Sequence, residues 1–188
     1  MKGKKSLNVI LLGSFIDYQI QLANQLCQSD KVSILSSAQK LDCAFDEIID
    51  DKVNYLFLGR GKPWYHPKGF HAIIDFIRTI NKIKPDIIHY QAGGSIFYLL
   101  LLPFITKYPF VITFHDVKQH VGEYSIITAF IRYFFRKFAD NIIVHGEYLK
   151  NQMINLYNIP KKKIHFTMIG EHEVAPFLKY AKEIKNPE

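Results

Sequence analysis

Short apolar runs rich in β-branched residues recur along the chain. Seven have the length of a buried strand, and they cover residues 8–13, 31–36, 53–59, 86–91, 110–116, 141–145 and 163–169. Between most of these runs, apolar residues return every three or four positions, as they do on one face of a helix. The helical segments are residues 17–28, 70–84, 95–103, 124–138 and 147–157. Strands therefore alternate with helices along most of the chain.

This alternation predicts right-handed crossovers and a mostly parallel sheet. The expected fold class is α/β: a Rossmann-like, doubly wound sheet of about seven strands with helices on both faces. A length of 188 residues suits one domain, residues 1–188. Residues 173–185 have the spacing of one more helix, and 186–188 resemble a linker. Residues 37–52 show no clear period and stay unassigned.

An apolar stretch from Ile96 to Phe114 has the length of a membrane-spanning helix. Pro103 and Pro109 interrupt it, and both would disturb the hydrogen bonds of a continuous helix. A short helix, a turn and then a strand fit these prolines better, so we do not expect the chain to cross a membrane.

The composition is that of a globular protein, with 48% hydrophobic and 22% charged residues. A formal charge of +7 favours anionic partners such as phosphates or acidic lipids. No nucleic-acid recognition motif accompanies this charge, so we expect no nucleic-acid partner. Cys27 and Cys43 are the only cysteines, and the chain starts without a signal-peptide pattern. A reducing cytoplasm with two inert thiols fits best.

Polar residues at the end of the fifth strand are the first candidates for chemistry. The run 109–116 ends in His115 and Asp116, and parallel sheets bind ligands at the carboxyl ends of their strands. A functional His115 is therefore favoured over one that only caps the strand. The loop that follows adds a cation, a base, a glycine and an acid: Lys118, His120, Gly122 and Glu123. For His120 and Glu123, functional and structural roles are equally open.

Two other strands are expected to end at the same edge of the parallel sheet, beside a shared cleft. His89 and Gln91 end the fourth strand, and the glycines at 93 and 94 that follow allow either close approach of a ligand or a plain turn. Gly13 and Ser14 follow the first strand, where backbone amides can approach a phosphate. Further glycines are missing, so a dinucleotide cofactor is not expected.

Other chemistries find no support in the sequence. The eight histidines and two cysteines lack the close spacing of metal ligands, so no metal is expected. No serine lies in a nucleophile elbow. Glu147, at the start of a helical segment, is interpreted as a helix cap.

The helical segment from Tyr124 to Phe138 combines aromatic and basic residues. These are Tyr133, Phe134, Phe135 and Phe138 with Arg132, Arg136 and Lys137. Such a helix either lies in the interface of an anionic membrane or packs on the core with a solvated basic edge. Both readings stay open.

The second half of the chain resembles the amino-terminal domain of GT-B glycosyltransferases of the retaining family 4 type. The resemblance rests on three motifs: KPDIIH at 84–89, VITFHD at 111–116 and ADNIIVHGE at 139–147. YNIP at 157–160, Lys163-Ile164 and Gly170 complete the pattern. The loop at 117–123 is similar to that of capsule and exopolysaccharide enzymes.

The resemblance implies transfer of a sugar from a nucleotide-sugar to a saccharide acceptor, often one linked to polyprenyl diphosphate, without a metal or other cofactor. It implies that His115 faces the transferred sugar and that Asp116 adjoins it. The expected acceptor-binding residues are Lys118, His120, Gly122, Glu123, His89 and Gln91. Gly13 and Ser14 are expected near the donor phosphates. The implied location is cytoplasmic, with peripheral contact at the inner face of an anionic membrane through Tyr124 to Phe138.

The family's carboxyl-terminal donor-binding domain is not found in these 188 residues. No glutamate is followed by another eight residues later, as the family's donor site requires. We therefore expect the chain alone to be inactive. Three explanations are open, and we rank them from most to least favoured. The chain is a fragment, one half of a two-chain enzyme, or a non-catalytic acceptor-binding or membrane-docking module.

Overall fold

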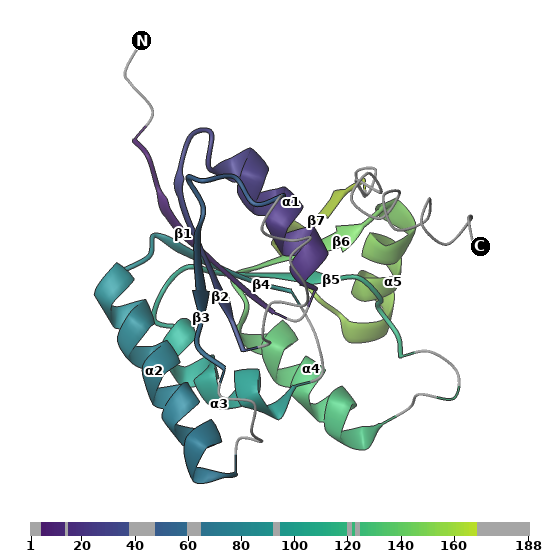
Figure 1. Cartoon of the computed structure of the whole chain (residues 1–188). Coiled ribbons are helices and arrows are strands. Elements are labelled where there is room, and N and C mark those ends of the chain that lie inside the picture. The colour runs from purple at the N-terminus through teal and green to yellow at the C-terminus, as the bar shows by residue number, and fades with distance from the viewer. Residues whose placement is uncertain are drawn as a thin grey trace, which may run out of the picture.

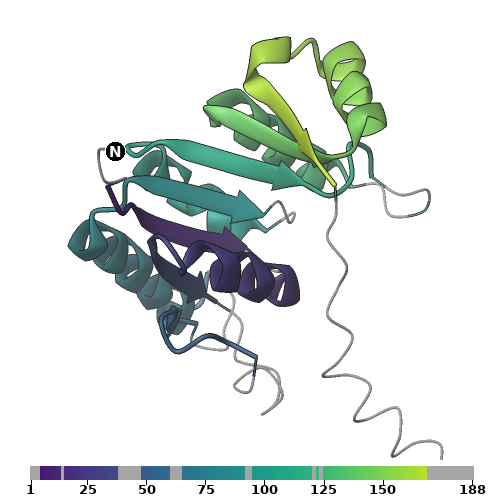
Figure 2. The ribbon, with the colours of Figure 1, turned by 90° about the horizontal axis from the view of Figure 1, so that it is seen from above.

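A computed structural model of the protein describes residues 5–13, 15–37, 48–59, 65–91, 95–119, 122 and 125–168. These residues contain one parallel sheet with the strand order β3-β2-β1-β4-β5-β6-β7. The strands are β1 (Asn8–Gly13), β2 (Lys31–Ser36), β3 (Asn54–Phe57), β4 (Ile87–Gln91), β5 (Phe110–Phe114), β6 (Asn141–His145) and β7 (Ile164–Thr167). Figure 2 shows β1, β4 and β5 side by side in the middle of the sheet. The predicted doubly wound α/β fold is confirmed.

Helices cover the two faces of the sheet unequally. They are α1 (Ile16–Leu26), α2 (Pro67–Ile83), α3 (Ile96–Ile105), α4 (Ile126–Phe138) and α5 (Glu147–Tyr157), followed by the short 3-10 helix η1 (Lys161–Lys163). Figure 1 shows α1 on one side of the sheet and α2, α3 and α4 on the other. The α5 helix joins the second group, since its Met153 is buried in the same core.

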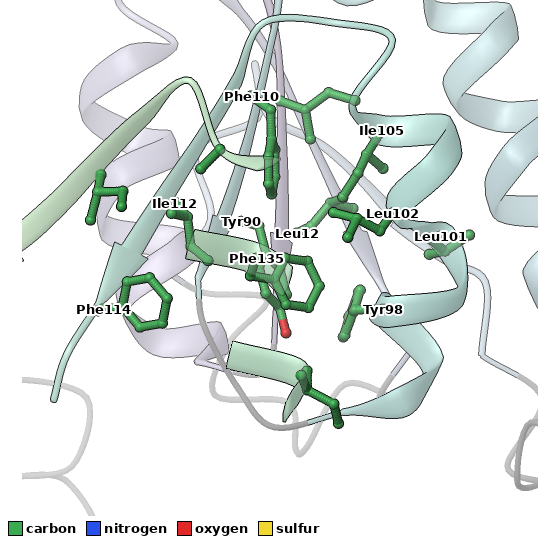
Figure 3. Close-up of a cluster of buried hydrophobic side chains, with 14 of the residues drawn as sticks. Leu12, Tyr90, Tyr98, Leu101, Leu102, Ile105, Phe110, Ile112, Phe114 and Phe135 are labelled. Carbon is green, nitrogen blue, oxygen red and sulfur yellow. The ribbon is translucent and has the colours of Figure 1, made fainter. Parts of the chain in front are cut away.

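The larger core lies between the sheet and α2 to α5. Alternate residues of the central strands enter it, as expected from the two-residue period of a strand. Phe135 of α4 stacks on Tyr90 of β4 with ring centroids 4.5 Å apart, and Tyr98 of α3 lies 5.0 Å from Tyr90 (Figure 3). These buried aromatic contacts fix α3 and α4 against the middle of the sheet.

The smaller core lies under α1 alone. Ile20 and Ala23 of α1 pack on Leu11 of β1 and Ile34 of β2. The same face of β5 and β6 is less covered, and Ile143 is only half-buried there. This face is therefore most open beyond α1, toward β6 and β7.

Three aspartates stabilise the amino edge of the sheet, where the strands begin. Each precedes a strand and accepts a hydrogen bond from a backbone N–H at the start of the neighbouring strand. The bonds join Leu7 N to Asp30, Asn8 N to Asp86 and Phe110 N to Asp140, at 3.0, 2.8 and 2.8 Å. Backbone donors that would otherwise lack a partner at this edge are thereby satisfied.

Most helices match the expected ranges to within about two residues, and two boundaries that differ have a clear physical cause. The α2 helix begins at Pro67, because His66 caps it by accepting a hydrogen bond from Lys68 N and proline suits the first helical turn. The expectation that Pro103 ends the third helix was wrong, since α3 continues to Ile105. Pro103 lies in the last turns, and burial of Leu102 and Ile105 offsets the one missing backbone bond.

Several expectations fall outside the described residues. They are the helix at 173–185, the linker at 186–188, Cys43 and Tyr124. Cys27 is buried, and Ser125 caps α4 by accepting a hydrogen bond from Thr128 N. Within the part of the chain that the structure describes, no helix is long and apolar enough to span a bilayer.

Candidate functional site

The candidate site lies where β1 and β4 run side by side, because the chain winds outward from this pair in both directions. Open α/β sheets bind ligands at such a switch point, beyond the carboxyl ends of the strands. Gly13 ends β1 and pairs with Gln91 at the end of β4. Gly13 has a φ of +137°, and a Cβ atom there would lie 2.6 Å from the Gln91 carbonyl oxygen. Only glycine fits this position.

Two buried glutamine amides flank Gly13. Gln91 belongs to β4, and Gln19 comes from the first turn of α1, with its Nε2 2.9 Å from the place of a Gly13 Cβ. Both side chains are buried, and neither their Nε2 nor their Oε1 atoms have a hydrogen-bond partner among the described residues. A buried polar atom without a partner costs about 1–3 kcal/mol, so four of them in one place mark a site suited to a polar ligand.

His115 lies in a cluster of rings beside these amides. Its ring centroid is 4.4 Å from that of Phe15, 5.2 Å from that of Tyr18 and 4.9 Å from that of His145. Tyr18 also meets His145 edge-on at 5.6 Å. The cluster joins the first turn of α1 to the carboxyl ends of β5 and β6. Burial raises the pKa of the Tyr18 phenol.

His89 lies deeper in the sheet than its place near a strand end suggested. It is buried, and a hydrogen bond of 2.7 Å joins its Nε2 to Thr113 Oγ1 on β5. Burial, and to a lesser degree the charge of His115, lowers the pKa of His89 to about 4. His89 is therefore neutral near pH 7, and it supports the site from inside the sheet through its bond to Thr113.

The loop after His115 is held by α4 and α5. Arg132 donates hydrogen bonds to the carbonyls of Asp116 and Val117, and its guanidinium lies 5.2 Å from the Phe114 ring centroid. Tyr157 donates to the Val117 carbonyl at 3.1 Å, and the Arg136 guanidinium lies 3.8 Å from the Tyr157 ring centroid. Both arginines of α4 thus face the sheet, and they are not a solvated or lipid-facing basic edge.

The structure brings together four of the predicted site residues: Gly13, His89, Gln91 and His115. Asp116, Lys118 and Gly122 lie on the exposed loop after β5. Ser14, His120 and Glu123 fall outside the described residues, as do the glycines at 93 and 94. The described residues contain no group of three or more histidine, cysteine or acidic side chains arranged to hold a metal ion.

Sequence reasoning missed Gln19, Phe15, Tyr18 and the packing of His145. One signal for Gln19 was available, because it is a polar residue next to Ile20 on the inward face of an amphipathic helix. Arg132 gave no such signal. Its role depends on how α4 packs against β5, which the local sequence does not record.

An open parallel sheet with polar groups at its switch point is the architecture of one Rossmann-like half of a GT-B fold. The model of Glycosyltransferase Family 4 matches residues 18–167, and the chain belongs to this family.

Solved structures with this fold include both glycosyltransferases and epimerases. The match to a UDP-N-acetylglucosamine 2-epimerase from Rickettsia bellii covers 98% of this chain and 50% of the epimerase chain, at 12% identity and a TM-score of 0.64. A glycosyltransferase from Rickettsia africae matches 98% of this chain with 51% of its own, at 16% identity and a TM-score of 0.63. HepE from Anabaena, solved with UDP-glucose, matches 95% with 50%, at 13% identity and a TM-score of 0.60.

These identities establish a shared fold and nothing finer. The chain spans about half the length of these three structures. No curated protein matches its sequence.

Proposed function

We propose that this chain is the acceptor-side half of a glycosyltransferase that moves a sugar from a nucleotide-sugar to a lipid-linked saccharide in the synthesis of bacterial surface polysaccharide. The family supports sugar transfer, and the complexes of HepE with UDP and with UDP-glucose support a nucleotide-sugar as donor. The lipid-linked acceptor and the polysaccharide product rest on the sequence resemblance alone.

The observation that carries this proposal is the pair of amides of Gln19 and Gln91 beside Gly13. Each amide offers both donors and an acceptor, and a sugar offers hydroxyls that can serve as either. The rings of Phe15 and His115 supply flat surfaces next to these polar groups. A polyhydroxylated ligand is therefore favoured over a purely anionic or apolar one.

The roles proposed for the individual residues rest on the family resemblance, and the described positions of Gly13, Gln91 and His115 around the switch point support them. His115 faces the transferred sugar, with Asp116 beside it. Gly13 and Ser14 leave room for the donor phosphates next to backbone amides. The acceptor lies along Gln91 and the loop residues Lys118, His120, Gly122 and Glu123. His89, expected among them, is buried against Thr113 and supports this site from within the sheet. No metal is part of this proposal.

Sugar transfer needs a second domain that holds the nucleotide. Charge that develops on a leaving nucleotide diphosphate must be stabilised by groups on both sides of a cleft. In this proposal residues 1–188 form one domain, and a donor-binding domain comes from a longer form of the chain or from a partner chain. The isolated domain then has little activity.

The test combines this domain with a donor-binding half, in one chain or two, and measures UDP release from UDP-glucose and from UDP-N-acetylglucosamine. His115→Ala should lower the turnover rate about 100-fold, the lower end of the range for a positioned catalytic side chain. His71→Ala is the matched control, since His71 is exposed on α2 away from the cleft. His115→Asn guards against misfolding, and thermal unfolding checks both variants. Equal turnover by wild type and both His115 variants would exclude the catalytic role.

A second candidate is a non-catalytic subunit that docks on a membrane. The observation in its favour is the row of exposed apolar residues along α4, within the segment expected to contact an anionic membrane. This candidate is preferred if the complete two-domain protein turns over neither donor while the chain still binds vesicles.

A further inference from the structure

An apolar groove runs between α3 and α4 on the outside of the helical layer. Its volume is about 420 Å³. Its lining is Leu99, Leu102, Pro103, Thr106, Phe130, Phe134 and Phe138. The only polar side chain among these is Thr106, whose hydroxyl donates to the Leu102 carbonyl at 2.8 Å. The groove thus offers a ligand almost no hydrogen bonds.

The rim of this groove exposes more apolar surface than a water-facing helix normally does. Ile126 is 76% exposed, Ile127 60% and Phe130 56%, and Tyr133 is exposed further along α4. A contiguous apolar patch of this kind on a surface helix marks a site of contact with a protein or a membrane.

A basic pocket adjoins the groove at the end of α4. It has a volume of about 430 Å³ and is lined by Lys137, Phe138, Ala139, Asp140, Pro160, Lys162 and Lys163. Phe138 lines both the groove and the pocket. Asp140 is the one acidic residue of the lining, and it already accepts the bond from Phe110 N. Three ammonium groups therefore meet one carboxylate.

Lys163 shows how this pocket is held. Its Nζ donates to the carbonyls of Arg136 and Lys137 at 3.4 Å, so it covers the open end of the α4 backbone. Lys137 and Lys162 are exposed on either side. Arg132 and Arg136 point toward β5 and do not contribute, so the cations come from the end of α4 and from η1.

We propose that this composite site binds one anionic phospholipid of a membrane, with a hydrocarbon chain in the α3–α4 groove and the phosphate in the lysine pocket. An apolar channel that ends in a cluster of cations matches an amphipathic anion along its length. The exposed rim of α4 then lies at the level of the headgroups. A second copy paired through this same face fits less well, because it would bring the same three lysines up against these.

The phospholipid is an anchor and not the sugar acceptor. The pocket lies at the amino edge of the sheet, beside the starts of β6 and β7, whereas His115 follows the carboxyl end of β5. The five residues of β5 separate the two edges by about 16 Å. A phosphate in the lysine pocket therefore does not reach the candidate cleft. The proposal does not depend on the proposed sugar transfer, and it deepens the membrane-docking candidate by naming the lipid and the two parts of its site.

The first experiment measures binding of the full chain to vesicles of phosphatidylcholine, with and without phosphatidylglycerol. We expect salt-sensitive binding to the mixed vesicles. The double variant Lys137→Glu with Lys162→Glu should weaken it at least about tenfold, since each cation near an anionic surface contributes about 1 kcal/mol. Phe130→Ser with Phe138→Ser should weaken it to a similar degree.

Matched controls come from α2, on a different part of the surface. The exposed fraction of Phe70 is 57%, similar to the 56% of Phe130, and Lys82 is exposed like Lys137. Phe70→Ser and Lys82→Glu should leave binding unchanged. No binding by wild type, or equal losses in the α2 variants, would overturn the proposal. His115→Ala should bind vesicles normally, which separates this result from any failure of sugar transfer.

The second experiment asks whether a single lipid enters the groove. Dihexanoyl phosphatidylglycerol, added below its micelle concentration, should shift the methyl NMR signals of Leu99 and Leu102 but not those of Leu22 on α1. Inorganic phosphate alone should leave the leucine signals unchanged. Shifts with phosphate alone would contradict a lipid ligand. A dimer in solution that Phe130→Ser with Phe138→Ser dissociates would mean that a second copy occupies the groove.

Discussion

His89 shows how a single buried side chain makes the stability of this protein depend on pH. Its ring has one described hydrogen bond, to Thr113, and its surroundings disfavour the charged form. An unfolded chain restores the usual pKa near 6.5, whereas the folded chain holds it at about 4. Between these two values the unfolded state binds a proton that the folded state does not.

We predict that the free energy of unfolding falls as the pH drops below about 6.5. The part of the unfolding free energy that depends on a neutral His89 is fully present above that pH and is lost progressively toward pH 4. At pH 5 the loss is about 2 kcal/mol. His89→Gln keeps a group that can bond to Thr113 but does not titrate, so most of this loss should disappear. Urea unfolding between pH 7 and pH 5 measures it. The same slope in wild type and His89→Gln would refute the assignment, and His71→Gln serves as the exposed control.

The residues of the candidate site were predictable to different degrees. Gly13, Gln91 and His115 stand at the ends of apolar runs, and parallel strands bring such ends to one edge. Gln19 and Arg132 stand inside helices, where their role depends on which strand the helix covers. Local sequence predicted the site's strand ends and not the helical side chains that complete it.

The α4 helix has an inner and an outer face with different surroundings. Phe135 and Ile131 are buried against the sheet, and Arg132 holds the loop after β5. The outer face carries Phe130 and the groove shared with α3. The sequence showed the aromatic and basic residues of this helix together. Core packing is confirmed for Ile131 and Phe135, and membrane contact stays a proposal. Its aromatics divide between core and surface, while two of its three cations turn inward.

We predict that Phe135→Ala lowers the free energy of unfolding by about 3–5 kcal/mol, because it leaves a cavity beside Tyr90. Phe138→Ala, three positions along the same helix, should cost less than about 1 kcal/mol because its ring is 47% exposed. Chemical denaturation of both variants gives the comparison. Similar costs would mean that α4 does not pack on the sheet through Phe135.

At the scale of the whole molecule, the mostly parallel, doubly wound sheet followed from the alternation of strands and helices, since crossovers have one hand. The unequal cover of the two faces did not. The sequence suggested helices on both faces, but only packing decides that α1 stands alone while α2 to α5 share the other side. The less covered face of β6 and β7 is a consequence of that imbalance.

The strand order also has a consequence for how the molecule folds. Neighbouring strands pair mostly across short stretches of chain, as in the Leu7–Asp30 and Phe110–Asp140 bonds, which span 23 and 30 residues. The β1–β4 pair is different, since its Asn8–Asp86 bond spans 78 residues. Closing this longer loop costs about 1 kcal/mol more in chain entropy.

We therefore expect the β1–β4 pair to form late. The folding φ-value is the fraction of a substitution's stability loss that already appears in the transition state. It should be higher for Ile142→Val in β6 than for Ile10→Val in β1. Each substitution lowers the free energy of unfolding by about 0.5–1.5 kcal/mol, most of which is large enough for a φ-value to be measured. Equal φ-values at the two positions would contradict this order. Because Gly13 and Gln91 meet on that late pair, the candidate site at the switch point is among the last parts of the protein to form.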